Sequence, residues 1–303
     1  MRGSRVRVAL LGACLLLAAC VRIPSAAPPA IAVGNRGEPP VAVSILGDAV
    51  YLVDPASGDV TRVASGLPNF QAGYAAWSPD RHILAYGDGG IVLVGRDDRR
   101  LRTLAPGASV SMPAWSPDGR RIVYGDGVGM WVVPAGGGRP IRVPLPRALA
   151  PFSFDWSPGP SIVFEAQALD CIPPTGCAST GSSDLYLVGP DGKGLRRLTR
   201  LGSASNPRWS PDGRRILFVR TVGRGKARTT QVWTVGPKGR GLAPLLSTPG
   251  VAAADWSPDG RQVALLRPGP IPHTLQLWIA DVDGHGLHAV GPPLPGDDGT
   301  VDW

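Results

Sequence analysis

Short apolar runs alternate with polar turns from residue 41 to the end of the chain, and no amphipathic helical period interrupts them. In one stretch, a run that ends at Trp115 is followed by three further runs, Arg121–Tyr124, Met130–Val133 and Ile141–Val143. Glycine-rich turns separate them. The same order returns several times along the chain, so each repeat is predicted to form four short antiparallel strands.

The first strand of each repeat ends in tryptophan, usually followed by Ser-Pro-Asp-Gly. These tryptophans recur at intervals of 38, 41, 53, 47 and 47 residues, at Trp77, Trp115, Trp156, Trp209, Trp256 and Trp303. Ser-Pro-Asp-Gly fits a type I turn, and a repeat of roughly 40–50 residues with several strands predicts a β-propeller. Each tryptophan is expected to fill the wedge between two blades, where burial is worth on the order of 3 kcal/mol.

The number of strands predicts how the ring closes. Five repeats are complete, whereas the first segment, Val41–Ser65, holds only three strands. The last segment, Thr300–Trp303, is a single strand without a blade. Pairing it antiparallel to Val41–Leu46 would remove two exposed sheet edges. The sequence therefore predicts an all-β, six-bladed propeller of four-stranded antiparallel blades, closed by the C-terminal strand.

The repeat resembles that of a known family. Trp-Ser-Pro-Asp-Gly-Arg-Arg-Ile, and later Arg-Arg-Leu-Thr after a glycine-rich turn, are similar to the TolB-type propeller repeat. Similar repeats occur in the propeller domains of prolyl oligopeptidase-like proteins. The resemblance covers residues 41–303 and implies the fold. We expect neither the hydrolase domain of one relative nor the separate amino-terminal module of the other, so it does not transfer their activities.

The first 19 residues have the features of an export signal. Arg2, Arg5 and Arg7 precede the apolar run Val8–Ala19, which is too short for a standard membrane span. The run ends in Leu-Ala-Ala-Cys, which resembles a bacterial lipobox, so Cys20 is predicted to carry the lipid. The alternative is ordinary secretion with Cys20 incidental. Residues 20–40, rich in Pro and Ala, are expected to tether the propeller to the membrane, outside the cytoplasm.

The number and distribution of charged residues argue against nucleic acid as a partner. The chain has 31 basic and 23 acidic residues, and removing the three leader arginines leaves a net charge of +5. The sequence shows no dense basic run interleaved with aromatic residues, so nucleic acid is not an expected partner. A mild attraction to anionic lipid headgroups is expected. We expect a monomer.

Two cysteines remain beyond Cys14 and Cys20. Cys171 and Cys177 lie six positions apart, which in an exported protein predicts a disulfide that closes a small loop. A metal site is the alternative, although no histidine or third cysteine lies nearby in the sequence.

Unequal connections between the second and third strands suggest a binding face. Three consecutive repeats have long connections, Glu165–Asp184, Arg220–Gln231 and Arg267–Thr274, predicted as loops. Long loops on a rigid scaffold often carry function, although tolerated insertion is an equal alternative. The candidate partner-binding residues favour an acidic partner and are Arg220, Arg224, Lys226, Arg228 and His273.

A second candidate set stands directly before the repeat tryptophans: Asp155, Arg208, Asp255 and Asp302. The first strand of a blade lines the channel, so these side chains would form an Asp–Arg network or hold a cation such as Ca²⁺. Alternatively, they point into the wall between blades. No other cofactor is expected. The sequence holds no nucleophile elbow, zinc-protease motif or phosphate loop, and no catalytic residue is assigned.

These observations favour a non-enzymatic lipoprotein of the cell envelope, whose propeller binds a protein or peptide partner. The alternative is a propeller-type enzyme, a lactonase or another hydrolase, with a metal in the channel. A third hypothesis, an accessory subunit of a transporter or cell-wall synthesis complex, does not differ from the first in sequence.

Overall fold

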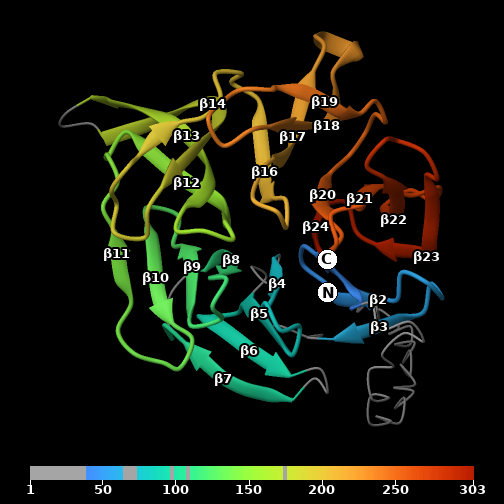
Figure 1. The fold of residues 1–303 in the computed structure, drawn as a ribbon, viewed down its shortest axis with the longest axis horizontal. Coiled ribbons are helices and arrows are strands. Elements are labelled where there is room, and N and C mark those ends of the chain that lie inside the picture. The colour runs from blue at the N-terminus through green and yellow to red at the C-terminus, as the bar shows by residue number, and fades with distance from the viewer. Residues whose placement is uncertain (1–38, 64–73, 96–98, 107–109, 173–175) are drawn as a thin grey trace, which may run out of the picture.

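Six four-stranded antiparallel sheets surround a central axis in the computed structural model (Figure 1). The structure describes residues 39–63, 74–95, 99–106, 110–172 and 176–303. In these ranges the only helical element is a single 3-10 turn, η1 (Gly225–Ala227). This confirms the predicted six-bladed propeller. The predicted export leader and lipid site at Cys20 lie outside the described residues. No helix in the described ranges is long and apolar enough to cross a membrane.

The blades are lettered A to F along the chain. Blade A contains β24 (Gly299–Asp302), β1 (Val41–Ile45), β2 (Ala49–Val53) and β3 (Val60–Val63). Blade B contains β4 (Ala75–Trp77), β5 (Ile83–Gly87), β6 (Ile91–Gly95) and β7 (Arg100–Leu104). Blade C contains β8 (Ser111–Trp115), β9 (Arg121–Gly125), β10 (Met130–Pro134) and β11 (Ile141–Val143).

The second half of the ring repeats this order. Blade D contains β12 (Leu149–Trp156), β13 (Ile162–Ile172), β14 (Gly176–Val188) and β15 (Arg196–Arg197). Blade E contains β16 (Ala204–Trp209), β17 (Ile216–Val222), β18 (Thr229–Val235) and β19 (Ala243–Leu246). Blade F contains β20 (Ala253–Trp256), β21 (Gln262–Pro268), β22 (Thr274–Asp281) and β23 (His288–Pro295).

Blade A joins the two ends of the chain, as the sequence predicted. Strand β24 pairs antiparallel with β1, and the register places Asp302 opposite Ala42 and Gly299 opposite Ile45. Strand β24 thus supplies the innermost strand that the first segment lacks. The pairing satisfies the edges of both strands and makes the ring continuous.

The Ser-Pro-Asp-Gly turns are built as the sequence predicted. In blade C, the Gly119 amide donates to the Ser116 carbonyl at 2.8 Å, and the Ser116 hydroxyl donates to Asp118 at 2.5 Å. Gly119 has a φ of +66°, which glycine adopts at no steric cost. The turn therefore fixes where each innermost strand ends and where the second strand begins.

The hydrophobic core is divided among six wedges, each between two neighbouring blades. Each wedge is a separate apolar cluster that contains one repeat tryptophan. Trp77, for example, packs with Val50 and Leu52 of blade A and with Leu84 of blade B. Five of the six tryptophans are buried, and Trp209 is half-buried. The prediction that these side chains fill the wedges is confirmed.

The expectation that the three long connections are loops was wrong for the first, which is a hairpin, and wrong in part for the second, whereas the third keeps a loop at 269–273 between β21 and β22. Strands β13 and β14 extend through most of the range Glu165–Asp184 as a hairpin, of 11 and 13 residues, with Gln167 paired to Ser183. Strands β17 and β18 likewise continue to Val222 and from Thr229, so their connection shrinks to 223–228. Sequence reasoning missed this because glycine and proline weaken the strand pattern, whereas pairing with the neighbouring strand satisfies the backbone.

Two faces of the ring can be distinguished from strand direction. The Ser-Pro turns and the turns between third and fourth strands lie at one end of each blade, here called the turn face. The connections between second and third strands lie at the other end, here called the hairpin face, because adjacent strands are antiparallel. The hairpins β13–β14, β17–β18 and β21–β22 all belong to the hairpin face.

Candidate functional site: the central cavity and the hairpin face

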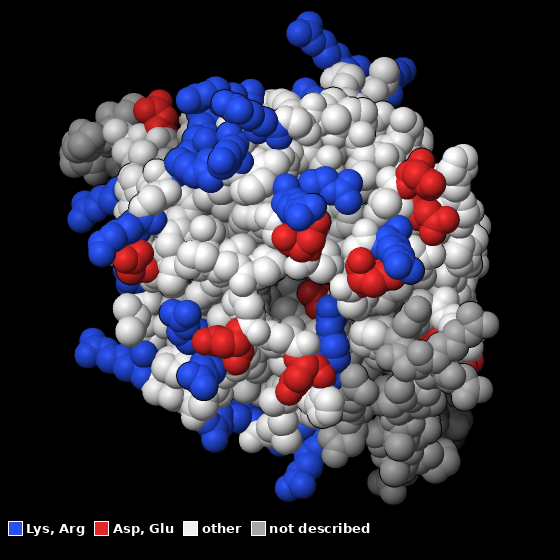
Figure 2. Space-filling model, in the orientation of Figure 1, with Lys and Arg blue, Asp and Glu red and all other residues white. Residues whose placement is uncertain are grey.

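A cavity of about 560 Å³ occupies the axis of the ring. All six repeat tryptophans line it, together with prolines of the Ser-Pro turns such as Pro79 and Pro211, so it reaches the turn face. Figure 2 shows a hollow at the centre with an acidic side chain inside it. The charged lining residues are Arg81, Asp155, Arg208, Asp255 and Asp302.

The three channel aspartates each connect one blade to the next, at three of the six joints. Asp302 of blade A accepts a hydrogen bond from the Trp77 amide of blade B at 2.8 Å. Asp155 accepts from the Trp209 amide at 2.6 Å, across blades D and E. Asp255 accepts from the Trp303 amide at 3.1 Å, across blades F and A. The two alternatives considered for these residues therefore combine, because the carboxylates face the channel and also bind the neighbouring blade.

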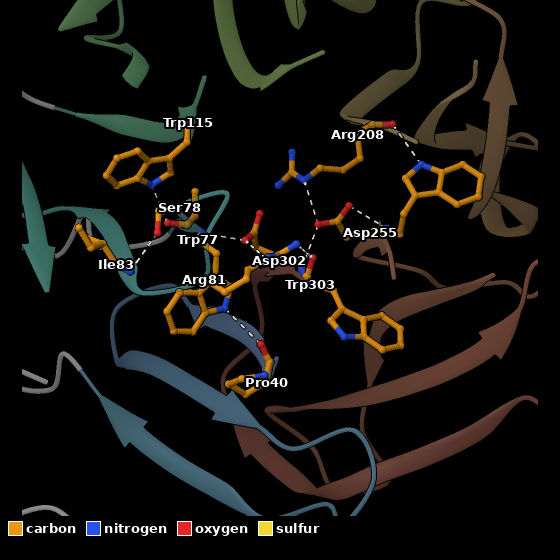
Figure 3. A network of polar contacts seen from close by, with 12 residues as sticks. Pro40, Trp77, Ser78, Arg81, Ile83, Trp115, Arg208, Asp255, Asp302 and Trp303 are labelled. Carbon is orange, nitrogen blue, oxygen red and sulfur yellow. Dashed lines mark hydrogen bonds and ion pairs between the residues drawn. The ribbon is translucent and has the colours of Figure 1, made fainter. Parts of the chain in front are cut away.

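Two arginines balance part of this negative charge. The Arg208 guanidinium lies 3.9 Å from Asp255, and the Arg81 guanidinium lies 3.7 Å from Asp302 (Figure 3). Arg81 also donates to the Trp303 carbonyl. It therefore connects the first Ser-Pro turn to the residue that follows β24. The expected Asp–Arg network is present, with Arg81 as an additional member.

Burial shifts the acidity of these carboxyl groups. Burial raises the pKa of Asp155 to about 6, although the positive charge of Arg208 opposes the shift. Burial also raises the pKa of Asp255 well above its usual value, and the nearby Asp302 raises it further. Between blades D and E, burial raises the pKa of Glu165 to about 7 against a hydrogen bond from the Asn206 amide. A raised carboxyl pKa suits proton transfer, but structural networks produce it as well.

The cation expected in the channel has little support in the side-chain arrangement. Within the described ranges, no three His, Cys, Asp or Glu side chains lie close enough together to hold a metal ion. The Asp155 and Asp255 carboxylates each accept two backbone amides, from Trp156 and Trp209 and from Trp256 and Trp303. Oxygens used in this way are poorly placed to surround Ca²⁺, which takes six to eight ligands.

The hairpin face carries the other candidate residues. Arg224, Lys226 and Arg228 are exposed around η1, at the end of β17–β18. Arg220 is placed differently, because its guanidinium stacks on the Trp233 ring at 4.3 Å. His273 is exposed and forms an ion pair with Asp297 at 2.9 Å when protonated. Arg224, Lys226 and Arg228 are thus the three of the five predicted cations with neither an ion pair nor a cation–π contact in this described part of the chain.

The two cysteines lie opposite each other in the β13–β14 hairpin. The register pairs Cys171 directly with Cys177, and directly opposed residues in antiparallel strands lie about 4.5–5.5 Å apart at Cα. That separation is within the range that disulfides span. The side chain of Cys177 is outside the described part, so the bond itself stays a prediction.

Sequence reasoning missed two groups of contacts. Arg81 occupies the turn position that holds glycine in three other repeats, and that irregularity is visible in the sequence. Arg121 stacks over Trp156 at 4.8 Å and Arg215 over Trp256 at 4.7 Å, each reaching the tryptophan of the next blade. The second arginine after Asp-Gly, which recurs in these two repeats, could have indicated this cation–π contact.

Comparison with known proteins shows the fold. No protein-family model matches the chain, and no curated protein matches it in sequence. TolB from Acinetobacter baumannii is similar in structure, with a TM-score of 0.64 and 18% identity over 87% of this chain. The chain spans 65% of that protein's length. A TolB protein from Agrobacterium tumefaciens gives a TM-score of 0.61 and 20% identity, covering 87% of this chain and 94% of its own.

An enzyme has the same architecture. A gluconolactonase from Xanthomonas campestris gives a TM-score of 0.59 and 17% identity, covering 86% of this chain and 87% of its own. At such low identity these likenesses concern the fold and not the activity. Together with the six tryptophan-centred blades, they show that this chain has the TolB-like, six-bladed β-propeller fold.

Proposed function

We propose that this chain is an exported, lipid-anchored and non-enzymatic propeller that binds a protein or peptide partner of the cell envelope on its hairpin face. The observation that carries the proposal is the unequal length of the strands on that face. Blades D, E and F extend hairpins there, whereas β5–β6 and β9–β10 close within 88–90 and 126–129. The TolB-like fold supports an interaction role by analogy alone.

The extended hairpins give the proposed surface both shape and rigidity. Paired strands satisfy their own backbone groups, so they project from the ring without the entropy cost of ordering a loop upon binding. The predicted Cys171–Cys177 disulfide would stiffen the longest hairpin further. Exposed serine, threonine and glycine cover its outer strand, for instance at Ser179, Thr180 and Ser182. These residues supply hydrogen-bonding groups without bulk.

The charge of this surface favours an acidic partner. Arg224, Lys226 and Arg228 stand together on the β17–β18 connection, and no carboxylate lies within 4.0 Å of any of them in the described structure. Exposed charges of one sign raise the association rate of a complementary partner more than they slow its release. The proposed partner is therefore an acidic segment that meets the hairpin tips.

The proposal is tested with a partner identified by crosslinking in intact membranes and then purified. Reversing two hairpin charges, Arg224→Glu with Lys226→Glu, is expected to weaken binding at least about tenfold, or about 1.4 kcal/mol. The matched control reverses one arginine and one lysine on the turn face, Arg196→Glu with Lys238→Glu. Arg197 is unsuitable as a control because its guanidinium holds the buried carboxylate of Asp184. Equal losses in the two variants would refute the hairpin site.

A second candidate function is catalysis in the central cavity. The raised pKa of Asp155 and Asp255 and the fold shared with a gluconolactonase favour it. Measuring lactone hydrolysis with and without added Ca²⁺ or Mn²⁺ tests this candidate. Turnover that disappears in Asp155→Asn but persists in the exposed turn variant Asp118→Asn would establish it and replace the partner-binding proposal.

A further inference from the structure

A second basic surface lies on the turn face, far from the hairpin tips. It consists of Arg196 on β15 and of Lys238 and Arg240 in the turn between β18 and β19; these three residues are called the basic patch. The Arg196 guanidinium donates to the Pro237 carbonyl, which places the end of blade D against this turn of blade E. An added Cβ at Gly239 would lie 3.4 Å from the Leu198 carbonyl, so the turn packs closely on the outer strand of blade D.

The basic patch is rich in uncompensated charge. All three side chains are exposed, and in the described ranges none lies within 4.0 Å of a carboxylate. The acidic groups nearby are already engaged. Asp191 pairs with Lys193 at 3.3 Å, Asp212 with Arg214 at 4.0 Å, and the buried Asp184 with Arg197. Figure 2 shows basic side chains gathered over the region labelled β13 and β14 in Figure 1.

The chain enters the propeller on this same face. Strand β1 pairs Ala42 with Asp302, so it begins at the end of the ring where the repeat tryptophans lie. Pro39 lines the cavity beside the Ser-Pro turns, and the Pro40 carbonyl accepts from the Trp77 indole at 3.2 Å. The 20-residue tether predicted from Cys20 therefore reaches the propeller on the turn face. A flexible tether of that length has a root-mean-square span of roughly 25 Å, comparable to the size of the domain itself.

We propose that the turn face lies against an anionic membrane, with Arg196, Lys238 and Arg240 bound to the phosphate groups of its lipids. Because the described chain begins on the turn face, a tether from Cys20 would hold this face near the bilayer, and the patch would then add electrostatic attraction to anionic headgroups. Two weak attachments, a lipid chain and a basic patch, together give stable and oriented binding. The hairpin face consequently points away from the membrane toward a partner. The inference goes beyond the proposed partner binding and does not require it.

The test measures binding of the full chain to two kinds of vesicle. Every protein tested carries Cys20→Ser, so no attached lipid contributes to binding. The leader is present in all of them and therefore affects each binding constant equally. The vesicles are pure phosphatidylcholine, or phosphatidylcholine with about one third phosphatidylglycerol, in about 0.1 M salt, where the Debye length is about 10 Å. The readout is the ratio of the two binding constants. The protein with Cys20→Ser as its single change is expected to bind the anionic vesicles more tightly than the neutral ones.

Two matched triple variants decide whether the patch is responsible. Arg196→Gln, Lys238→Gln and Arg240→Gln together are expected to reduce that ratio at least about tenfold, because each cation near an anionic surface contributes to the attraction. The control variant is Arg224→Gln, Lys226→Gln and Arg228→Gln. It also removes three positive charges, from two arginines and one lysine, but on the hairpin face. This control is expected to keep the ratio within about threefold, since those tips lie beyond a Debye length from the bilayer.

Each other outcome overturns the inference. An undiminished ratio in the patch variant, or an equal reduction in the hairpin variant, would show that net charge and not the turn face attracts the membrane. A wild-type chain that binds duplex DNA but shows no preference for anionic vesicles would assign the patch to nucleic acid.

Thermal unfolding checks that each variant folds. If the triple patch variant does not fold, the single exposed change Lys238→Gln is used, with an expected loss of severalfold and Lys226→Gln as its control.

Discussion

At the scale of single residues, the position before each repeat tryptophan determines how neighbouring blades are joined. Where it is aspartate, its carboxylate accepts the amide of the next blade's tryptophan, as Asp302 does for Trp77. Where it is alanine, no carboxylate is available, and the Trp115 indole donates to the Ala76 carbonyl at 3.1 Å. A hydrogen bond to a charged acceptor contributes about 1.5–3 kcal/mol, roughly twice a neutral one. The aspartates are therefore placed at the joints of blades D–E, F–A and A–B.

The raised pKa of Asp155 predicts a specific pH dependence of stability. Its pKa rises from 3.8 to about 6 on folding, so the folded chain holds this proton more tightly than the unfolded chain. The stability that Asp155 provides relative to Asp155→Asn is thus greatest below pH 4. It is expected to fall by up to about 3 kcal/mol as the pH rises through 6. Chemical unfolding of both proteins across this range measures the difference.

An exposed turn aspartate supplies the control with the opposite sign. The Ser116 hydroxyl lowers the pKa of Asp118, so the stability that Asp118 provides is present at neutral pH and lost on acidification. The comparison of wild type with Asp118→Asn should therefore change in the reverse direction. A difference for Asp155→Asn that does not vary with pH would contradict the assigned pKa.

The unusual backbone at Arg81 gives a second prediction at this scale. Arg81 has a φ of +58° at a turn position where Gly119, Gly213 and Gly260 have values of +66°, +67° and +71°. Both Arg81→Gly and Arg81→Ala remove the contacts with Asp302 and the Trp303 carbonyl. Only alanine keeps the left-handed strain, so Arg81→Ala is expected to be less stable than Arg81→Gly by about 1 kcal/mol. Denaturant midpoints of the two variants test this, and equal midpoints would contradict a strained Arg81.

At the scale of strands, β24 determines whether the ring closes. It supplies the innermost strand of blade A, and Val301 and Trp303 are buried in the wedge between blades F and A. The extended hairpin β13–β14 has a different role, since its tip projects from blade D with exposed side chains. Strand β24 is thus required for closure, whereas the outer part of the β13–β14 hairpin is a peripheral extension.

Removing residues 299–303 is expected to lower the free energy of unfolding by at least about 3 kcal/mol, because loss of one buried tryptophan side chain already costs that much. The deletion also exposes the edge of β1. The measurement is thermal or denaturant unfolding against wild type.

A hairpin of similar size serves as the comparison. Replacing residues 171–177 with Asn-Gly, which favours a two-residue hairpin turn, should leave stability nearly unchanged. Deletion of β24 without loss of stability, or an equal loss from the shortened hairpin, would contradict the assigned roles.

At the scale of the whole molecule, the two faces of the ring differ in shape and in proposed role. The turn face carries the cavity mouth, the entry of the tether and the basic patch, and the hairpin face carries three projecting hairpins. This division suits the proposed role, in which one side would meet the membrane and the other a partner. The six wedge-shaped cores make the ring a rigid support that keeps the two faces apart.

Lipid attachment at Cys20 remains a prediction at this scale, and one substitution tests it. Cys20→Ser is expected to move the protein from the membrane fraction to the soluble fraction, or to leave it unprocessed with the leader attached. Labelling with a radioactive fatty acid, followed by fractionation, measures both properties. A variant that still incorporates the fatty acid would show that another residue carries the lipid. A wild-type chain that incorporates none would favour ordinary secretion.

The sequence determined the fold because the fold repeats. Six tryptophans at a blade-length period, with Ser-Pro-Asp-Gly turns after most of them, sufficed for the number of blades and of strands in each. The closing strand was predictable as well, because a three-stranded first segment and a lone last strand complement each other. Local turn chemistry and period-two patterning act through neighbouring residues, so they can be recognised without three-dimensional information.

Tertiary structure alone decided which polar groups meet. Asp255 and Trp303 are 48 residues apart, and Arg81 and Trp303 are 222 apart, yet ring closure brings both pairs into contact. Ring closure also buries Asp155 and Asp255 and so raises their pKa, which no local pattern encodes. The hairpins were mistaken for loops because cross-strand pairing, and not intrinsic propensity, stabilises them. The basic patch likewise forms only where blade D meets the turn of blade E, since the charges involved come from separate repeats.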